Sequence, residues 1–209
     1  MKKIMGLAIS ATLLIVLVVG GTWAYFQDTE SSEGNYFVAG TLDLTLNTAS
    51  GVVDALFEVE NVAPGYTGTA TAALANIGSI DGDLTIAIGT VANTPGSGGT
   101  EFEGGSGELG ANLDVAMYLD LDDSGTWNTA DIGLAADGTT YENTDGNVDL
   151  VYVKADSLSA KSWAKKYELA AGDSVDLVID WKVATTVGNE IQGDKVSFDL
   201  NFTLDQVTS

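Results

Sequence analysis

Several segments of the chain alternate strictly between apolar and polar residues, and this period of two is the feature that most limits the fold. In residues 41–47, Leu42, Leu44 and Leu46 share one face, and polar side chains occupy the other. The same alternation occurs in residues 113–119, 148–153, 175–181 and 196–204. Because successive side chains of a strand point to opposite faces, the pattern predicts half-buried antiparallel strands.

Turn signals separate these predicted strands. They are Pro64-Gly65, Asp81-Gly82, Asp137-Gly138, Asp145-Gly146 and Gly172-Asp173. With residues 66–76 and 83–91 as further strands, the pattern contains about eight or nine strands, a number that suits a jelly roll. The sequence therefore predicts an all-β, jelly-roll-like β-sandwich over residues 41–209, with long loops and one short helix.

Two segments interrupt the strand pattern. Residues 93–110 are rich in Gly, Ser and Thr, which predicts a mobile surface loop. In residues 156–169, Leu158, Trp163 and Tyr167 could share one helical face, so this segment is the predicted helix.

The N-terminal residues predict an exported protein. Lys2 and Lys3 precede an apolar run over residues 4–19, and small residues then lead to Ala24. This pattern is typical of a signal peptide spanning residues 1–24, with cleavage between Ala24 and Tyr25. The alternative is an uncleaved membrane anchor. With cleavage, the chain contacts the membrane only through its signal peptide.

The chain is strongly acidic, with a formal net charge of −22. Removal of residues 1–24 takes away Lys2 and Lys3 and no acid, which makes the charge −24. Such a surface repels phosphate, so nucleic acid is excluded as a partner. Solubility in salty surroundings and cation binding both remain explanations of the charge. Cysteine is absent, so no disulfide braces the fold.

Residues 120–131 fit the spacing of a twelve-residue calcium loop, with Gly125 at the position of the sharp turn. The loop departs from the helix-flanked form because its flanks are predicted strands and its last position is Asp instead of Glu. The alternative interpretation is a solvated acidic hairpin tip. The candidate ligands are Asp120, Asp122, Ser124, Thr126, Asn128 and Asp131.

The remaining features of the sequence indicate a function less specifically. Histidine is absent, which excludes imidazole zinc ligands and a Ser-His-Asp triad, so no catalytic residue is predicted. A cluster of lysines is either a solvated helix face or a patch that docks onto an acidic face of the next copy; it comprises Lys154, Lys161, Lys165 and Lys166. The triplet Asn201-Phe202-Thr203 is a glycosylation sequon.

The first 90 residues resemble a known family. The likeness is carried by residues 21–28, 35–37 and 39–44, by the Pro64-Gly65 turn and by Asn76 with the following Gly78-Ser79. These segments are similar to the TasA and camelysin family of secreted biofilm-matrix fibre proteins. The signal peptides of this family are cut by a signal peptidase of the endoplasmic-reticulum type, which implies a mature start at Tyr25.

The resemblance implies a jelly-roll subunit of an extracellular fibre, matrix or cell surface that polymerises with copies of itself. Each copy donates its N-terminal segment, residues 25–40, as a strand to its neighbour, with Tyr25, Phe26, Tyr36 and Phe37 as its apolar residues. A structural subunit of this kind is not an enzyme, and the absence of histidine argues against proteolysis. Calcium is a candidate cofactor through the spacing of residues 120–131, which is not a feature carried over from the family. The alternatives are a calcium-dependent adhesion module that binds polysaccharide or other matrix components, and the metallopeptidase activity ascribed to camelysins.

Overall fold

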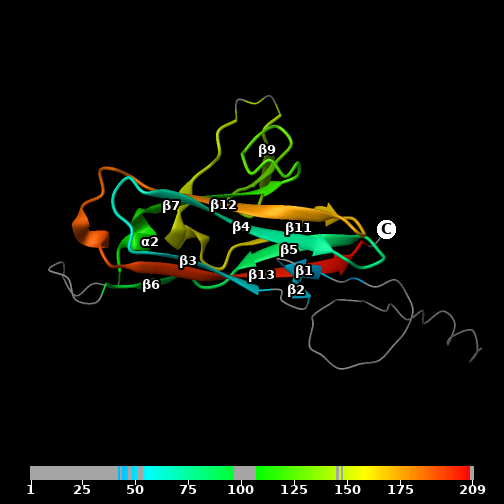
Figure 1. Cartoon of the computed structure of the whole chain (residues 1–209), viewed down its shortest axis with the longest axis horizontal. Helices are drawn as coiled ribbons and strands as arrows, with labels where there is room; N and C mark the ends of the chain where they lie inside the picture. The colour runs from blue at the N-terminus through cyan, green and yellow to red at the C-terminus, as the bar shows by residue number, and fades with distance from the viewer. Residues whose placement is uncertain are drawn as a thin grey trace, which may run out of the picture.

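The described part of the chain forms two antiparallel sheets packed face to face (Figure 1). The structure is a computed structural model. It describes residues 42, 44–46, 49–50, 54–96, 107–144, 146 and 148–207. The predicted fold class, a mostly β sandwich with one short helix, is confirmed.

The larger sheet has the strand order β2-β1-β4-β12-β7-β8-β9, and β10 also pairs with β7. Its strands are β1 (Leu44–Leu46), β2 (Ala49–Ser50), β4 (Thr67–Asn76), β7 (Leu113–Asp120), β8 (Ile132–Leu134), β9 (Thr140–Glu142), β10 (Val153–Lys154) and β12 (Ser174–Val183). The smaller sheet has the order β11-β5-β13-β3, and β6 pairs with β13. Its strands are β3 (Asp54–Glu60), β5 (Gly82–Ile88), β6 (Ala92–Thr94), β11 (Ser162–Leu169) and β13 (Lys195–Gln206).

Helical structure is sparse within the described residues. It consists of the single-turn helix α2 (Leu109–Asn112) and two 3₁₀ turns, η1 (Ala155–Leu158) and η2 (Asn189–Ile191). In these parts of the chain no helix is long and apolar enough to cross a bilayer.

The core lies between the two sheets and is built from the apolar positions of the alternating strands. On β7, Leu113, Val115, Met117 and Leu119 are almost fully buried and belong to the core. On β13, Phe198 stacks on Phe57 of β3 with ring centroids 4.6 Å apart. Each sheet therefore buries one face, as the period of two predicts.

The strands predicted at residues 113–119, 175–181 and 196–204 are confirmed as β7, β12 and β13, and those at 66–76 and 83–91 as β4 and β5. The strand predicted at residues 41–47 is described only as β1. The sequence pattern missed β3, which pairs with the long strand β13 over Asp54–Glu60.

The helix predicted at residues 156–169 is wrong, because most of this segment is the strand β11. Trp163 pairs with Ile86, and Tyr167 pairs with Leu84. A step of four residues along β11 therefore corresponds to a step of only two residues along β5. A bulge absorbs the difference, and Lys165 within it has φ 53°. The bulge therefore produces the four-residue spacing of apolar side chains that suggested a helix.

The strand predicted at residues 148–153 is also wrong for most of its length, because only Val153 and Lys154 pair with β7. The N–H of Val148 donates to Oδ1 of Asn143, and the N–H of Val151 donates to the hydroxyl of Tyr141. Hydrogen bonds to these side chains thus take the place of the strand pairing that alternation predicted.

The loop predicted at residues 93–110 is ordered at both ends. β6 begins before it, and α2 buries Leu109 completely. The carboxylate of Asp194 accepts hydrogen bonds from the N–H groups of Gly96 (2.9 Å) and Glu108 (2.7 Å), which joins the two ends. Residues 97–106 lie outside the described part of the chain.

Candidate functional site

The predicted calcium loop forms the connection of a β-hairpin on the larger sheet. Asp120 is the last residue of β7, and β8 returns antiparallel to β7 directly after Asp131. Figure 1 shows the segment around β9 projecting from the sandwich on this side. The first and last candidate ligands are therefore held at the rigid base of the hairpin.

Three carboxylates of the loop converge. Oxygen atoms of Asp120, Asp122 and Asp131 lie within 4.8 Å of one another. Asp120 and Asp131 are buried, with 3% and 1% of their surface exposed, whereas Asp122 is exposed. Carboxylates are rarely buried without compensation, so this base of the loop needs hydrogen bonds, a cation or both.

Backbone N–H groups supply the hydrogen bonds to the two buried carboxylates. Asp120 accepts from the N–H groups of Asp122, Ser124 and Gly125, the last to Oδ2 at 2.6 Å. Asp131 accepts from Leu121 through Oδ1 and from Asn128 through Oδ2, the latter at 2.8 Å. The two carboxylates thereby shape the loop that carries the remaining candidates. Gly125 has φ +67°, which suits the turn position that glycine holds in such loops.

Three of the other candidates surround the amide nitrogen of the fourth, Asn128. This Nδ2 atom lies 3.2 Å and 3.3 Å from the two oxygens of Asp122, 2.9 Å from Oγ of Ser124 and 3.0 Å from the carbonyl of Thr126. An amide nitrogen has only two hydrogens, so the acceptors outnumber the protons that can reach them. The centre of the loop is thus lined by oxygen atoms, as a hard cation requires.

The carboxyl groups of the loop differ in their electrostatics. Burial, opposed by hydrogen bonds from Asn128 and Leu121, raises the pKa of Asp131 above its usual value. Hydrogen bonds from Ser124 and Asn128 lower the pKa of Asp122. The cost of ionisation is therefore concentrated at the base of the loop, where a bound cation would relieve it.

Sequence reasoning missed a further carboxylate, Asp176 on β12. It pairs in register with Asp120 of β7. Burial raises the pKa of Asp176, and the charges of Asp123 and Asp120 raise it further. Alternation in the sequence predicts that Asp176 lies on the solvent-exposed face of its strand. Its position beside the loop follows from the pairing of β12 with β7, which the sequence pattern does not give.

An aromatic cluster attaches the loop to the sheet and was also missed. The ring of Trp127 lies 5.5 Å from the rings of both Tyr118 and Tyr141, and its Nε1 donates to the carbonyl of Val148 at 2.8 Å. The hydroxyl of Tyr118 is buried without a hydrogen-bond partner in the described structure. Burial, followed by the charge of Asp180, raises the pKa of Tyr118. Trp127 is therefore the contact between the loop and the aromatic side chains of β7 and β9.

The ligand chemistry favours one class of metal. The available groups are carboxylates, a hydroxyl and a backbone carbonyl, which suit calcium or magnesium. The chain has no histidine and no cysteine. It therefore does not fit the histidine-based zinc centres of metallopeptidases.

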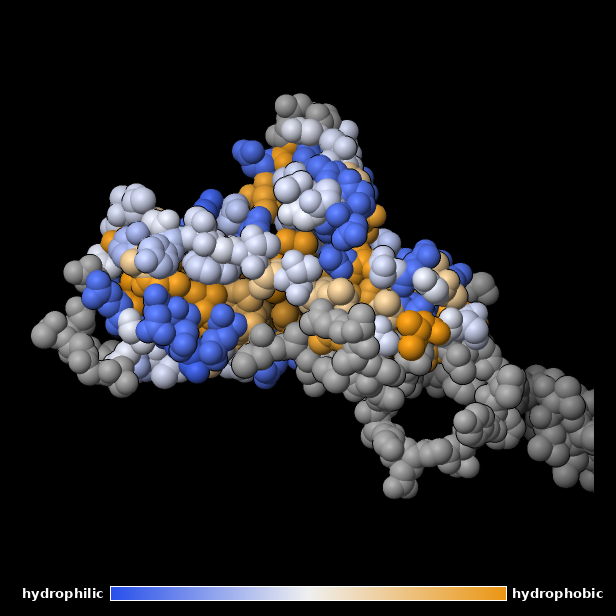
Figure 2. Space-filling model, in the orientation of Figure 1, coloured by the Kyte–Doolittle hydropathy of each residue, from blue (hydrophilic) through white to orange (hydrophobic). Residues whose placement is uncertain are grey.

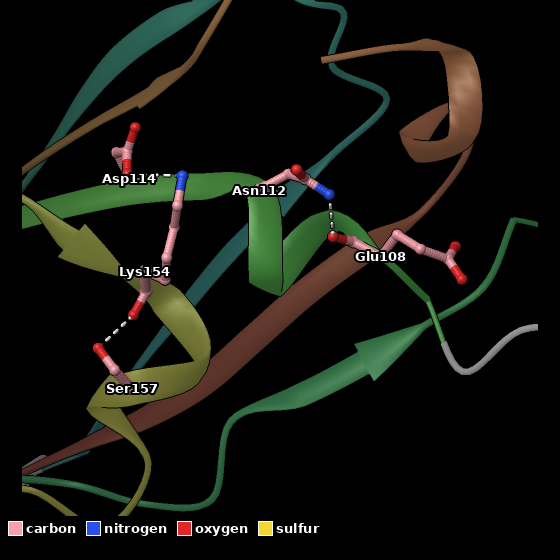
Figure 3. A network of polar contacts seen from close by, with 5 residues as sticks. All are labelled: Glu108, Asn112, Asp114, Lys154 and Ser157. Carbon is pink, nitrogen blue, oxygen red and sulfur yellow. Dashed lines mark hydrogen bonds and ion pairs between the residues drawn. The ribbon is translucent and has the colours of Figure 1, made fainter. Parts of the chain in front are cut away.

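The predicted lysine cluster is not a helix face, because Lys154 ends β10, Lys161 precedes β11, and Lys165 and Lys166 lie on β11. Figure 3 shows Lys154 beside Asp114, with Nζ and Oδ1 2.8 Å apart, while its carbonyl accepts from Ser157. Lys165 pairs with Asp205 at 3.5 Å. Two of the four lysines thus have acidic partners within this chain.

Several predicted sites lie outside the described residues. They are the signal peptide of residues 1–24, the cleavage site at Ala24 and Tyr25, and the donor segment of residues 25–40 with Tyr25, Phe26, Tyr36 and Phe37.

The fold and the loop together define an acidic, mostly β sandwich protein with an oxygen-lined candidate cation site on a hairpin. The model of the camelysin metallo-endopeptidase family matches residues 1–209, so the chain belongs to that family. The resemblance found in the sequence is thereby confirmed. No curated protein is similar enough in sequence to count as a match.

Proposed function

We propose that the protein is a non-enzymatic subunit of an extracellular fibre or biofilm matrix that polymerises with copies of itself. Residues 25–40 of one copy add a strand to the next copy, and the loop of residues 120–131 binds calcium. The observation that carries this proposal is an uncovered strand edge beside the hydrophobic core.

The uncovered edge belongs to β4. One edge of this strand pairs with β12 along residues 67–75. On the other edge, β1 pairs only with Leu74, Ala75 and Asn76, and no other described strand pairs with residues 67–72. Unpaired N–H and C=O groups along an edge are a template for an added strand.

The inner side of this edge has room for donor side chains. Alternation from the buried Ala72 and Leu74 places Gly68 and Ala70 on the inward face of β4. Ala70 is nevertheless exposed, and the indole of Trp181 lies directly on Gly68. Figure 2 shows a band of hydrophobic surface between the two layers on the viewed side. An added strand with apolar side chains could cover such surface.

The other edges are less suited to accept a strand. β11 carries a bulge and three lysines in and beside it, which are common defences against edge pairing. β9 has only three residues. β3 is acidic, with Glu58 and Glu60 exposed. The open stretch of β4 has no charged residue and no proline, so it is the best acceptor.

The family name supports a second candidate function, a metallo-endopeptidase. The absence of histidine argues against it, as does a loop lined only by oxygen ligands. Cleavage of casein by the purified protein, abolished by a chelator, would replace our proposal with this one.

Electron microscopy of a matched pair of variants tests the strand-donation mechanism. Ala70→Glu places a charge on the inward face of the acceptor edge, whereas Thr71→Glu places the same charge on the exposed outer face one residue away. We expect the chain that starts at Tyr25 and its Thr71→Glu variant to form fibres with rising concentration. Ala70→Glu and a chain without residues 25–37 should remain monomeric.

Fibres formed by the shortened chain, or by Ala70→Glu as readily as by Thr71→Glu, would contradict the mechanism. Circular dichroism of each monomer controls for folding. Persistent monomers of the unchanged chain that bind polysaccharide would favour the adhesion module.

A further inference from the structure

The chain contains a single N-glycosylation triplet, and no part of the proposed assembly uses it. Among all asparagines of the sequence, only Asn201 is followed by Ser or Thr at the second position, in Asn201-Phe202-Thr203. This triplet, with a middle residue other than proline, is the acceptor pattern for N-linked oligosaccharides. The triplet alone occurs often by chance, so the structure must decide whether the site can carry a sugar.

The structure presents Asn201 to solvent on a firmly held strand. Leu200 and Phe202, its neighbours on β13, are 2% and 1% exposed and belong to the core. Asn201 is exposed and Thr203 half-buried, and both face outward. No hydrogen bond to the Asn201 side chain occurs within the described residues. The acceptor amide is thus free while its backbone stays in the sheet.

The surface beside Asn201 leaves space for a first sugar. Ala87 of β5 lies directly opposite Asn201, and Ser162 of β11 lies opposite Ala87. Gly89 follows on the same side, with room for a Cβ atom at ordinary contact distance from Asp199. Small residues of β5 and β11 thus lie beside Asn201 on one side. A bulky oligosaccharide needs exposed surface without large side chains around its attachment point.

We propose that Asn201 carries an N-linked oligosaccharide on the outer face of the smaller sheet. The donor is a polyprenyl-phosphate-linked oligosaccharide at the membrane across which the chain is exported. Nδ2 of Asn201 forms a bond to the anomeric carbon of the sugar, the bond from that carbon to the phosphate oxygen breaks, and the phosphate leaves with the electron pair. The transferase base takes one Nδ2 proton. The proposal therefore rests on export.

The attachment point also has a consequence for assembly. Asn201 lies on the smaller sheet, whereas the open edge of β4 and the acidic loop belong to the larger sheet. A sugar at Asn201 leaves both features uncovered and keeps the outer face of the smaller sheet on the outside of a fibre.

Mass spectrometry of the protein purified from the medium of the cells that produce it tests the site. Cleavage after Lys195 releases a peptide that begins at Val196 and contains the triplet. We expect this peptide to carry a sugar mass that fragmentation assigns to Asn201. Thr203→Ser keeps the acceptor pattern and should keep the sugar, whereas Thr203→Val keeps the branched shape and should lose it completely.

An unmodified peptide from the exported protein would overturn the proposal, as would a sugar that persists in Thr203→Val. N-terminal sequencing of the same sample separates this failure from failure of the proposed export. A start at Tyr25 with an unmodified peptide removes the sugar and leaves export intact. A chain that stays in the cells with residues 1–24 attached overturns both.

Discussion

Calcium should stabilise this protein by binding the loop of residues 120–131, whose carboxylates converge. A ligand that binds only the folded state adds RT ln(1 + [L]/Kd) to the free energy of unfolding. Extracellular calcium modules have Kd values of about 0.1–1 mM, so about 10 mM calcium adds about 1.4–2.7 kcal/mol. In a domain of this size, 1 kcal/mol shifts Tm by about 2–4 °C. The expected rise in Tm is therefore about 3–10 °C.

The variant Asp131→Asn should abolish this rise. Asp131 is 1% exposed and belongs to the cluster of converging carboxylates, so its replacement removes a charged ligand from the base of the loop. The matched control is Asp149→Asn, which removes the same charge from an exposed position outside that cluster. Melting each protein with and without calcium by calorimetry cancels the intrinsic cost of each substitution.

Two results would refute the reasoning. One is a wild-type Tm that stays unchanged at about 10 mM calcium, because the site would then be weaker than the extracellular range allows. The other is an equal rise in wild type and Asp131→Asn, because calcium would then act elsewhere. Sodium chloride at equal ionic strength controls for screening of the acidic surface.

Further predictions concern the Gly-rich loop of residues 93–110 and four tyrosines that are buried or half-buried. Asp194→Ala leaves the N–H groups of Gly96 and Glu108 without their acceptor, so denaturant unfolding should show a loss of about 1–3 kcal/mol. The exposed control Asp199→Ala should change the free energy of unfolding by less than about 0.5 kcal/mol. Burial raises the pKa of Tyr118, Tyr141, Tyr152 and Tyr167. Their stabilising contribution is complete below pH 10.0 and is lost as pH rises through the raised values, so tyrosinate should appear together with unfolding; ionisation at the usual pKa in the folded protein would contradict this.

Alternation predicted the strands that are straight and buried on one face, and it was wrong where another interaction changed the period. β13 alternates along nearly its whole length and β12 at its start, whereas β7 is buried on both faces from Val115 to Asp120. In β11, a bulge inserts extra residues between Trp163 and Tyr167 and imitates a helical spacing. Beyond β9, the N–H groups of Val148 and Val151 donate to side chains instead of to a neighbouring strand. Neither the bulge nor the missing strand pairing can be recognised from the order of apolar and polar residues.

Part of the candidate site was likewise predictable from the sequence, and part depends on tertiary structure. The spacing of Asp120, Asp122 and Asp131 along the chain was enough to predict that their carboxylates converge. The approach of Asp176 depends on the register between β12 and β7, which joins residues 56 positions apart, from 120 to 176. The contacts of Trp127 with Tyr118 and Tyr141 likewise depend on tertiary packing. The candidate ligands within the loop were therefore predictable, whereas the residues of the sheet that lie against the loop were not.

The residues that carry the family resemblance have structural roles here. Asn76 is fully buried, and its Nδ2 donates to the carbonyls of Ile80 and Leu169, which ties β4 to the end of β11 in the other sheet. Gly65 takes φ +86° in the turn before β4 and donates to the carbonyl of Val183. Asn76 thus joins the two sheets, and Gly65 ties the turn before β4 to β12 of the same sheet. Family membership therefore bears on the sandwich, whereas the acidic loop, which follows these motifs in the chain, must be tested by its own chemistry.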